Sequence, residues 1–483
     1  MNITLNIEIS NQEIKNFGDL EREIFEIALG VGRQLMQQAL EKLDDELLAD
    51  RDVSRYRNKG FQQTCIKTKL GAVEYKRRVY VDNATPESVR CVHLLDEALA
   101  MDKVGLVSAE VCQIAATAVC ETTYRGAAEL IAETTGLDIS AQGVWDIIQR
   151  LGASQVSLVQ RHAELAQHHK STGTLVTKLL YEENDGIWLK LQGISRQEHG
   201  PAKEMKVGIA YDGVQWVETK SGKRRVLDNK VAYASFENAK EFRKHKEGLV
   251  ASRFDVDEIE LRVCNGDGAN WIRQKNSTHC IDVLDKFHRN KKITECVRNP
   301  EFASLLRTHL YNNDIDLLLD CLEAQINSLS DPAETEKLRE LQSYYTENKG
   351  SLTGYYDRGI SIPETREPGT IHHARLGSME SNVFTLIGNR MKGRRACWSE
   401  AGANNLAVLL CQRHTVGFEN LFASLPTLPE KEPEFVDTLP LYGADKIPKR
   451  EGKGYEWKDS LTISGTTGWL SGFLKEISRS NNF

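Results

Sequence analysis

This sequence has no long apolar segment, and that absence sets the first limit on its class. No stretch approaches the roughly 18 uncharged apolar residues that a membrane span requires. The first residues carry no basic stretch followed by an apolar core, the pattern of a secretory leader. We therefore expect a cytoplasmic protein without a membrane partner.

Paired cysteines are missing as well. Ten cysteines are scattered over 483 residues, and none belongs to a CxxC pair. Most lie in apolar surroundings, which favours buried free thiols over disulfides or a zinc site.

A net positive charge, the simplest mark of nucleic-acid binding, is also absent. The formal net charge is -7, but residues 1–53 hold twelve acidic and five basic side chains, so the remainder is neutral. Basic clusters punctuate that remainder, and a solvated surface is the default interpretation of each. Two clusters flank the candidate acids described below, which makes them candidates for phosphate contact. They consist of Lys286, Arg289, Lys291 and Lys292, and of Arg390, Lys392, Arg394 and Arg395.

The N-terminal part is predicted to contain a long helix and a β-hairpin. Apolar residues recur at helical spacing from about residue 19 to 49. Residues 64–82 alternate about Leu70-Gly71 as the two strands of a hairpin. Its basic side chains suit a DNA-facing ribbon or a polar sheet face, and the sequence leaves both open.

Residues 124–151 have the pattern of a helix-turn-helix. A helix over 124–134 is followed by a glycine-containing turn and by Ser140, a good N-cap for a second helix over 141–151. An ordinary helical hairpin fits the same pattern. DNA recognition by the second helix, with Gln142 near its start, is therefore a hypothesis.

Beyond residue 173 the pattern changes from helical to alternating. Candidate strands cover residues 175–183, 187–192 and 206–212, and a helix over 236–249 precedes a strand that leads to Asp267. This order predicts a mixed α/β sheet with antiparallel members. Asp267 lies between two glycines at a strand end, where a carboxylate is held by the sheet yet open to a cleft.

The rest of the chain is predicted to be helical and then extended. Residues 299–345 have helical periodicity and indicate an all-helical insertion in the α/β domain. A helix opens near Ser378, with Glu380 in its first turn, and another covers 401–412. Five prolines beyond Phe418 indicate an extended tail.

Three acids could form a two-metal centre for phosphodiester cleavage, which needs carboxylates that converge on two divalent cations about 4 Å apart. They are Asp185, Asp267 and Glu380. Each has an ordinary alternative: Asn-Asp-Gly around Asp185 is a hairpin-turn signal, and an acid in a first helical turn suits the helix dipole. Asp212 and Glu183 compete for the first position.

Asp285 and His288 lie one helical turn apart in the segment DKFH. They could ligate a metal or support its ligands. A histidine next to a basic helix is more often structural or in contact with phosphate.

The motifs together resemble a known family. Their order is DGIW, GDGANWI, LDKFHRNKK, a helical segment, GSMESN and NRMKGRRACWSEAGANNLAVLL, with GAVEYKRRVYVD in the N-terminal hairpin. This order resembles the Mutator-like DDE transposases of bacterial insertion sequences, in the ISLre-type branch long described as an uncharacterised protein family. The likeness covers most of the chain and is weakest in the tail.

The resemblance implies an RNase H-like catalytic domain interrupted by an all-helical insertion and preceded by a mainly helical DNA-binding region with a β-hairpin. It places the three acids of a DDE triad on Asp185, Asp267 and Glu380, with two Mg²⁺ or Mn²⁺ ions. The family's (C/D)xxH motif is filled by Asp285 and His288. The two basic clusters would hold the DNA backbone. Trp398 could stack on a distorted base, or it could pack in the core.

The resulting expectation is a DNA transposase that cuts and joins strands at insertion-sequence ends. Its partners would be terminal inverted repeats, target DNA and further copies of the chain, because two ends must be brought together. An RNase H-like nuclease without transposition and an idle DNA-binding protein derived from a transposase are the alternatives. The expected divisions are 1–104 (helix and hairpin), 105–170 (helix-turn-helix-like), 171–298 and 371–417 (RNase H-like), 299–370 (helical insertion) and 418–483 (tail).

Overall fold

The computed structural model describes residues 14–84, 91–99, 107–170, 173–220, 222–272, 279–363, 376–393, 395–415 and 417. The chain divides into two units, Met1–Thr427 and Leu428–Phe483, and every described residue belongs to the first. The predicted proline-rich tail, residues 418–483, lies outside the described residues.

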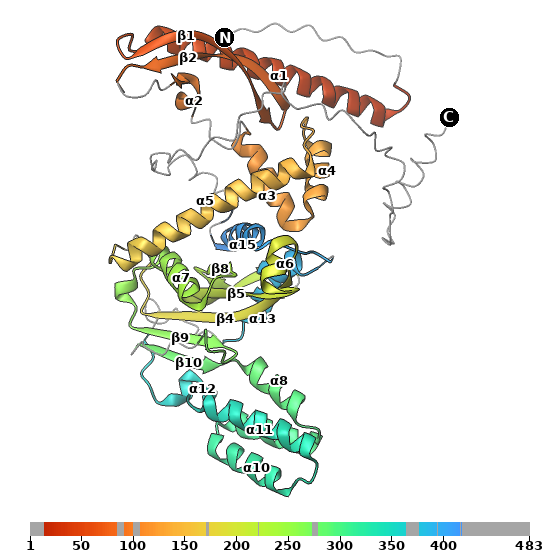
Figure 1. The fold of residues 1–483 in the computed structure, drawn as a ribbon, viewed down its shortest axis with the longest axis vertical. Coiled ribbons are helices and arrows are strands. Elements are labelled where there is room, and N and C mark those ends of the chain that lie inside the picture. The colour runs from red at the N-terminus through yellow and green to blue at the C-terminus, as the bar shows by residue number, and fades with distance from the viewer. Residues whose placement is uncertain are drawn as a thin grey trace. The chain divides into compact units, whose positions relative to one another are not determined.

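A mixed five-stranded sheet is the centre of the described chain (Figure 1). Its order is β10–β9–β4–β5–β8, in which β4 is parallel to β9 and antiparallel to β5. β10 continues the parallel half, and β8 pairs antiparallel with β5. The strands are β4 (Leu179–Lys190), β5 (Ala202–Tyr211), β8 (Val231–Ser235), β9 (Leu261–Gly266) and β10 (Cys280–Leu284). The predicted mixed α/β fold with antiparallel members is thus confirmed.

One strand replaces the two that were predicted around Asp185. The sequence favoured a break at Asn184-Asp185-Gly186, but β4 runs through it without interruption. β5 pairs with β4 from Tyr181 to Lys190, across the whole Asn-Asp-Gly segment. The prediction of a turn was wrong because this ladder of backbone hydrogen bonds outweighs the local turn preference.

Helices cover both faces of the sheet. Leu179, Val207 and Ile209 face a core shared with α15 (Glu400–Thr415), whereas Leu180 and Tyr233 face α7 (Ala239–Arg253). Because successive side chains of a strand point to opposite faces, strands buried on both sides are apolar at consecutive positions. Buried polar residues, such as Glu183 and Asp185 of β4, are therefore exceptions in these strands and need an explanation.

The N-terminal elements follow the prediction closely. They are α1 (Phe17–Asp50), β1 (Tyr56–Thr68), β2 (Gly71–Asp82), β3 (Cys91–Val92) and α2 (Leu94–Ala98). Gly71 begins β2 with φ +113°, a conformation that favours glycine in the hairpin turn. Arg78 is buried against Asp44, and Arg77 against Asp96. Two of the hairpin's basic residues are therefore structural.

Three helices follow: α3 (Ala109–Glu121), α4 (Tyr124–Thr134) and α5 (Ala141–Gln167). The Ser140 hydroxyl accepts a hydrogen bond from the Gly143 N–H at 3.0 Å, as its predicted capping role requires. α5 does not end at residue 151, however. It continues to Gln167 because its later turns bury Val159 in the core beneath the sheet and Ala163 against Gly248 of α7.

The remaining helices include a group with a core of its own. α8 (Lys286–Cys296), α9 (Pro300–Asn312), α10 (Ile315–Ser328), α11 (Pro332–Glu347) and α12 (Lys349–Leu352) pack around Leu306, Leu318 and Leu341. The other elements are α6 (Gly193–His199), β6 (Gly213–Thr219), β7 (Gly222–Asp228), η1 (Val256–Glu258), η2 (Tyr355–Arg358), α13 (Met379–Val383), the π-helix η3 (Phe384–Gly388) and α14 (Asn389–Met391). The β6–β7 hairpin was not predicted. Within the described ranges, no helix is long and apolar enough to cross a membrane.

The contact between α5 and α7 yields a stability prediction. A Cβ at Gly248 would overlap the backbone of Ala163, so Gly248→Ala should force the helices apart and lower the free energy of unfolding by about 1–3 kcal/mol. Gly350→Ala is the matched control, because a Cβ there meets nothing within 4 Å. Chemical denaturation of the two variants gives the comparison. Equal stability would contradict the tight packing of α5 on α7.

Candidate metal centre

The register of two parallel strands brings Asp185 and Asp267 close together. Glu183 of β4 pairs with Asn265 of β9. Asp185 lies two residues later in β4 and shares the face of Glu183. Asp267 lies two residues after Asn265, just past the end of β9, where the charges of Asp185 and His288 act on its pKa. Asp185 is buried within β4, with 8 % of its surface exposed, and Asp267 directly follows β9 and is half-buried.

Two further side chains complete the cluster. His288 on α8 places Nε2 at 3.5 Å from Oδ2 of Asp185. Candidate ligand atoms of Asp185, His288 and Glu380 all lie within 4.8 Å of one another. Glu380 is exposed in the first turn of α13. The cluster thus unites side chains from the sheet, from α8 and from α13.

Asp285 has a structural part in this arrangement. Its carboxylate caps α8 by accepting hydrogen bonds from the N–H groups of Phe287 (2.9 Å) and His288 (3.2 Å). Its other oxygen accepts one from Asn265 at 2.9 Å. The Asp-x-x-His motif therefore fixes the start of α8 with its first member and presents His288 to Asp185 with its second.

Glu183 anchors the segments that surround the cluster. Its carboxylate is fully buried and accepts hydrogen bonds from the Tyr211 hydroxyl (2.7 Å) and the Asn265 amide (2.8 Å). The backbone N–H groups of Gly377 (2.9 Å) and Ser378 (3.1 Å) also donate to it. These bonds tie β4 to β5, to β9 and to the residues that lead into α13, and so position Glu380.

The neighbouring carboxylates repel one another. Burial, together with the charge of Asp185, raises the pKa of Asp267, although hydrogen bonding by the Ala269 N–H and the charge of His288 oppose the shift. Burial also raises the pKa of Glu204 on β5, and the charges of Asp267 and Asp185 add to this effect. A cation would relieve this repulsion.

His288 responds in the opposite direction. Its hydrogen bond to Asp185 raises the pKa of the imidazole, and the charges of Asp285 and Asp267 reinforce the shift against the opposing effect of burial. The ring can thus act as a cation beside the acids, or as a neutral ligand once a metal neutralises them.

The competitors for the first acidic position have other roles. Asp212 is buried beyond the far end of the β4–β5 ladder and accepts a hydrogen bond from Asn229 at 3.0 Å. Glu183 lies on the same face of the sheet as Asp185, but its carboxylate already accepts hydrogen bonds from Tyr211, Asn265 and the backbone before α13. Among the candidates Asp185, Asp212 and Glu183, only Asp185 belongs to the group that could hold a metal.

Several predicted DNA contacts are engaged within the protein. Arg289 is buried and donates to the Leu352 carbonyl at 2.7 Å, whereas Lys292 is bound to Glu340. Arg390 donates to the Val119 carbonyl and lies 5.3 Å from the Trp398 ring centroid. Trp398 is itself buried, with 7 % exposed, so its ring is unavailable for stacking on a base in this structure.

The other predicted DNA contacts remain at the surface. Lys286, Lys291, Lys392 and Arg395 are exposed. Gln142 is exposed too and donates to Asp146 at 3.0 Å. Arg394 lies outside the described residues.

The sequence prediction missed Asn265 and Glu204, and it considered Glu183 only as a competitor for the first acidic position. A signal for two of them was present: Glu183-x-Asp185 and Asn265-x-Asp267 have the same i, i+2 spacing, which places both members on one face of a strand. Glu204 gave no such signal. It approaches Gly186 so closely that a Cβ there would overlap its carboxylate.

The raised pKa of Asp267 predicts a pH-dependent effect of Asp267→Asn. Because the folded pKa exceeds the usual value of 3.8, ionisation destabilises the folded state, and stability is lost as pH rises from that value through the folded pKa. In metal-free buffer at neutral pH, Asp267→Asn should therefore be more stable than wild type. The difference should vanish below about pH 3.8.

Denaturation midpoints across this pH range, in the presence of a chelator, measure the effect of Asp267→Asn. Asp320→Asn, which changes an exposed acid on α10, is the matched control and should show no comparable gain. A neutral-pH stability of Asp267→Asn at or below that of wild type would refute the prediction.

A second prediction concerns the buried carboxylate of Glu183. Glu183→Gln would put an NH₂ group among four donors and leave at least one of them without an acceptor, so it should cost about 1–3 kcal/mol of unfolding free energy. The control is Glu74→Gln, an exposed position on β2. Chemical denaturation at neutral pH tests both, and a loss no larger than the control's would show that these bonds contribute little.

Known proteins resemble this chain over a range that includes the whole candidate metal centre. The model of an uncharacterised protein family, UPF0236, matches residues 11–418, which include every member of the cluster. A relative from Streptococcus gallolyticus, described as "UPF0236 protein in vanSb 3'region", is 24% identical over 417 residues, which make up 84% of each chain. The chain therefore belongs to the uncharacterised protein family UPF0236.

Proposed function

We propose that this protein is a DDE transposase that cuts and joins DNA strands at insertion-sequence ends with two divalent metal ions. The observation that carries the proposal is the convergence of Asp185, His288 and Glu380 within 4.8 Å, with Asp267 just past the end of the adjacent strand. Sheet, α8 and α13 each contribute to it. Such convergence from distant parts of a chain is typical of a metal-dependent active site.

The sheet topology supports an RNase H-like domain. In chain order β4, β5 and β8 form an antiparallel meander, and β9 and β10 extend the other side of β4 in parallel. We expect such a domain to carry one acid on its first strand and another after its fourth. Asp185 lies on β4, the first strand of this sheet along the chain, and Asp267 follows β9, the fourth. The helices α9 to α12 stand between α8 and α13, where the resemblance places an insertion.

The donor set suits Mg²⁺ or Mn²⁺. Carboxylate oxygens are the ligands that these hard cations prefer, and the mutual repulsion of Asp267, Asp185 and Glu204 favours cation binding. Asp185, Asp267 and Glu380 would hold the ions, and His288 would assist Asp185. When bound, two such ions supply activation of the attacking oxygen and stabilisation of the leaving oxygen.

The chain would carry out two successive displacements at the same acids. In the first, water attacks the phosphorus at an element end, and the 3′-oxygen leaves with a proton as a 3′-hydroxyl. In the second, that hydroxyl attacks a target phosphodiester, forms the new strand junction and releases a target 3′-hydroxyl. Exposed Lys286, Lys291, Lys392 and Arg395 are the described basic residues best able to hold phosphates near the site. Strand cleavage and joining would take place on DNA in the cytoplasm. Two or more copies of the chain would hold the two ends of the element together.

The test incubates full-length protein and Mg²⁺ or Mn²⁺ with labelled DNA that carries the inverted repeats flanking its gene. Asp185→Asn, Asp267→Asn and Glu380→Gln should each lower cleavage by two or more orders of magnitude, because loss of a metal ligand removes several kcal/mol of transition-state stabilisation. Asp212→Asn, a buried acid outside the cluster, is the matched control and should retain activity within a few fold.

The alternative functions predict other outcomes of this experiment. Cleavage without preference for terminal sequences and without strand joining would indicate an RNase H-like nuclease. Salt-sensitive DNA binding that survives Asp267→Asn, with no metal-dependent turnover, would indicate an idle DNA-binding protein. Cleavage that persists in Asp185→Asn, Asp267→Asn and Glu380→Gln would contradict the proposed two-metal mechanism.

A further inference from the structure

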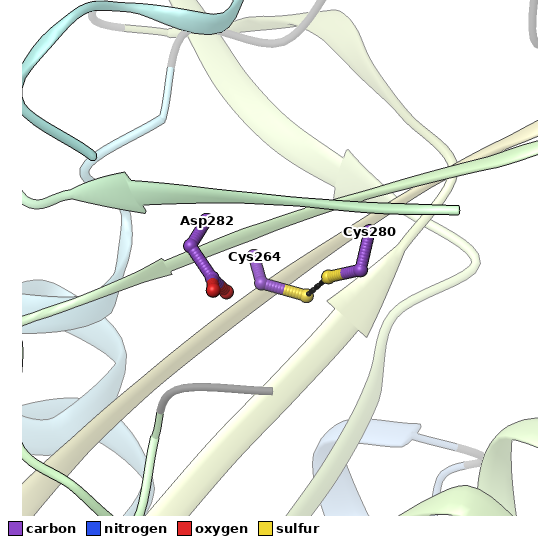
Figure 2. A group of neighbouring side chains, drawn as sticks. All are labelled: Cys264, Cys280 and Asp282. Atoms are coloured by element: carbon purple, nitrogen blue, oxygen red, sulfur yellow. Dashed lines mark hydrogen bonds between the residues drawn. The ribbon is translucent and has the colours of Figure 1, made fainter. Parts of the chain in front are cut away.

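The face of β9 and β10 that points away from the metal centre carries two thiols and a carboxylate. Asp282 is paired with Cys264, and Cys280 with Arg262. These four residues share one face, whereas Asn265 belongs to the other. Figure 2 shows the two sulfur atoms facing each other, with Asp282 beside them.

The three side chains lie close enough together to share one metal ion. One ligand atom from each of Cys264, Cys280 and Asp282 lies within 4.8 Å of the others. Cys264 is buried, whereas Cys280 and Asp282 are half-buried. An ion could therefore enter from solvent on the side of Cys280 and Asp282.

We propose that Cys264, Cys280 and Asp282 bind a thiophilic divalent cation of the zinc class. Two thiolates and a carboxylate are a donor set that suits Zn²⁺ rather than Mg²⁺. Three protein ligands leave one tetrahedral position, which water would fill. On binding, each thiol exchanges its S–H bond for a bond to the ion and releases a proton to solvent.

The two thiols are free, so both could ligate an ion. Cys264 and Cys280 are diagonal neighbours on adjacent parallel strands, and their sulfur atoms are 2.7 Å apart. Two metal–sulfur bonds of about 2.3 Å require roughly 3.7 Å between the sulfur atoms. Binding would therefore require one side chain to turn, and half-buried Cys280 is the more exposed of the two.

The surrounding charges are compatible with a bound cation. Glu182, the β4 neighbour of Cys264, accepts hydrogen bonds from Lys246 and Arg262 and is therefore committed to them. Arg262 also pairs with Glu247. Two thiolates, a carboxylate and a divalent ion carry one net negative charge, which Lys246 and Arg262 lie close enough to stabilise.

A cation here would clamp the edge strand of the sheet. β9 leads into Asp267, and β10 leads into Asp285 and α8, which carries His288. Cross-linking these strands on one face would limit the movement of the acids on the other. The site does not depend on the proposed transposase chemistry, since its ligands and its readout are separate.

Cobalt is a suitable probe because thiolate ligands give Co²⁺ a sulfur-to-metal charge-transfer absorption, which the sulfur-free carboxylate centre cannot produce. Full-length reduced protein, stripped of metal by a chelator, should bind one Co²⁺ per chain with this absorption and lose it to Zn²⁺. The same band should persist in Asp267→Asn. Zn²⁺ should also raise the melting temperature of both proteins.

Substitution of the ligands decides the assignment. Cys280→Ser and Asp282→Asn should weaken Zn²⁺ binding by more than the roughly 10–100-fold that loss of an outer contact costs. Cys91→Ser, at an exposed cysteine, is the control and should bind as wild type does. Absence of the band, its survival in Cys280→Ser, or a Cys264–Cys280 disulfide found by mass spectrometry in metal-free protein would overturn the proposal.

Discussion

The buried carboxylate of Glu183 is the interaction on which the candidate metal centre depends. Burial of a charge costs several kcal/mol unless hydrogen bonds replace its water, and here four donors do so: a tyrosine hydroxyl, an amide and two backbone N–H groups. The donors come from β5, β9 and the segment before α13. An arrangement that separated β5, β9 and the segment before α13 would leave the Glu183 carboxylate buried without all of its donors. This one carboxylate therefore holds three distant segments together.

Two acids on one strand thus have opposite tasks. Glu183 is saturated with donors, whereas Asp185, two residues later, contacts His288 and adds its charge to that of Asp267. The frame can hold these repelling carboxylates together because its stability comes from elsewhere, from Glu183 and from the cap that Asp285 provides to α8. A cation site needs both kinds of carboxylate. Some are fully hydrogen-bonded and hold the fold, and others repel one another until a bound ion neutralises them.

Local patterns predicted a good part of this structure. The bounds of α4, the cap at Ser140 and the strand leading to Asp267 follow from periodicity and turn chemistry, which short segments carry by themselves. Non-local pairing was not predictable in the same way. β4 passes through a turn signal because β5 lies beside it, and Arg289 and Trp398 are buried by segments far away in the chain. The contact between the Cys264 and Cys280 sulfur atoms likewise depends on strand register. It could not be predicted from two cysteines that lie sixteen residues apart in the sequence.

Strand alternation also explains how two chemically different donor sets can lie so close together. Along β9, Cys264 points to one face and Asn265 to the other. β10 carries Cys280 and Asp282 on the thiol face and leads into Asp285, which contacts Asn265. The sheet lies between the thiols and the candidate carboxylate centre. If both proposed sites bind metal, hard cations would meet oxygen and imidazole donors on one side, and soft cations would meet thiols on the other.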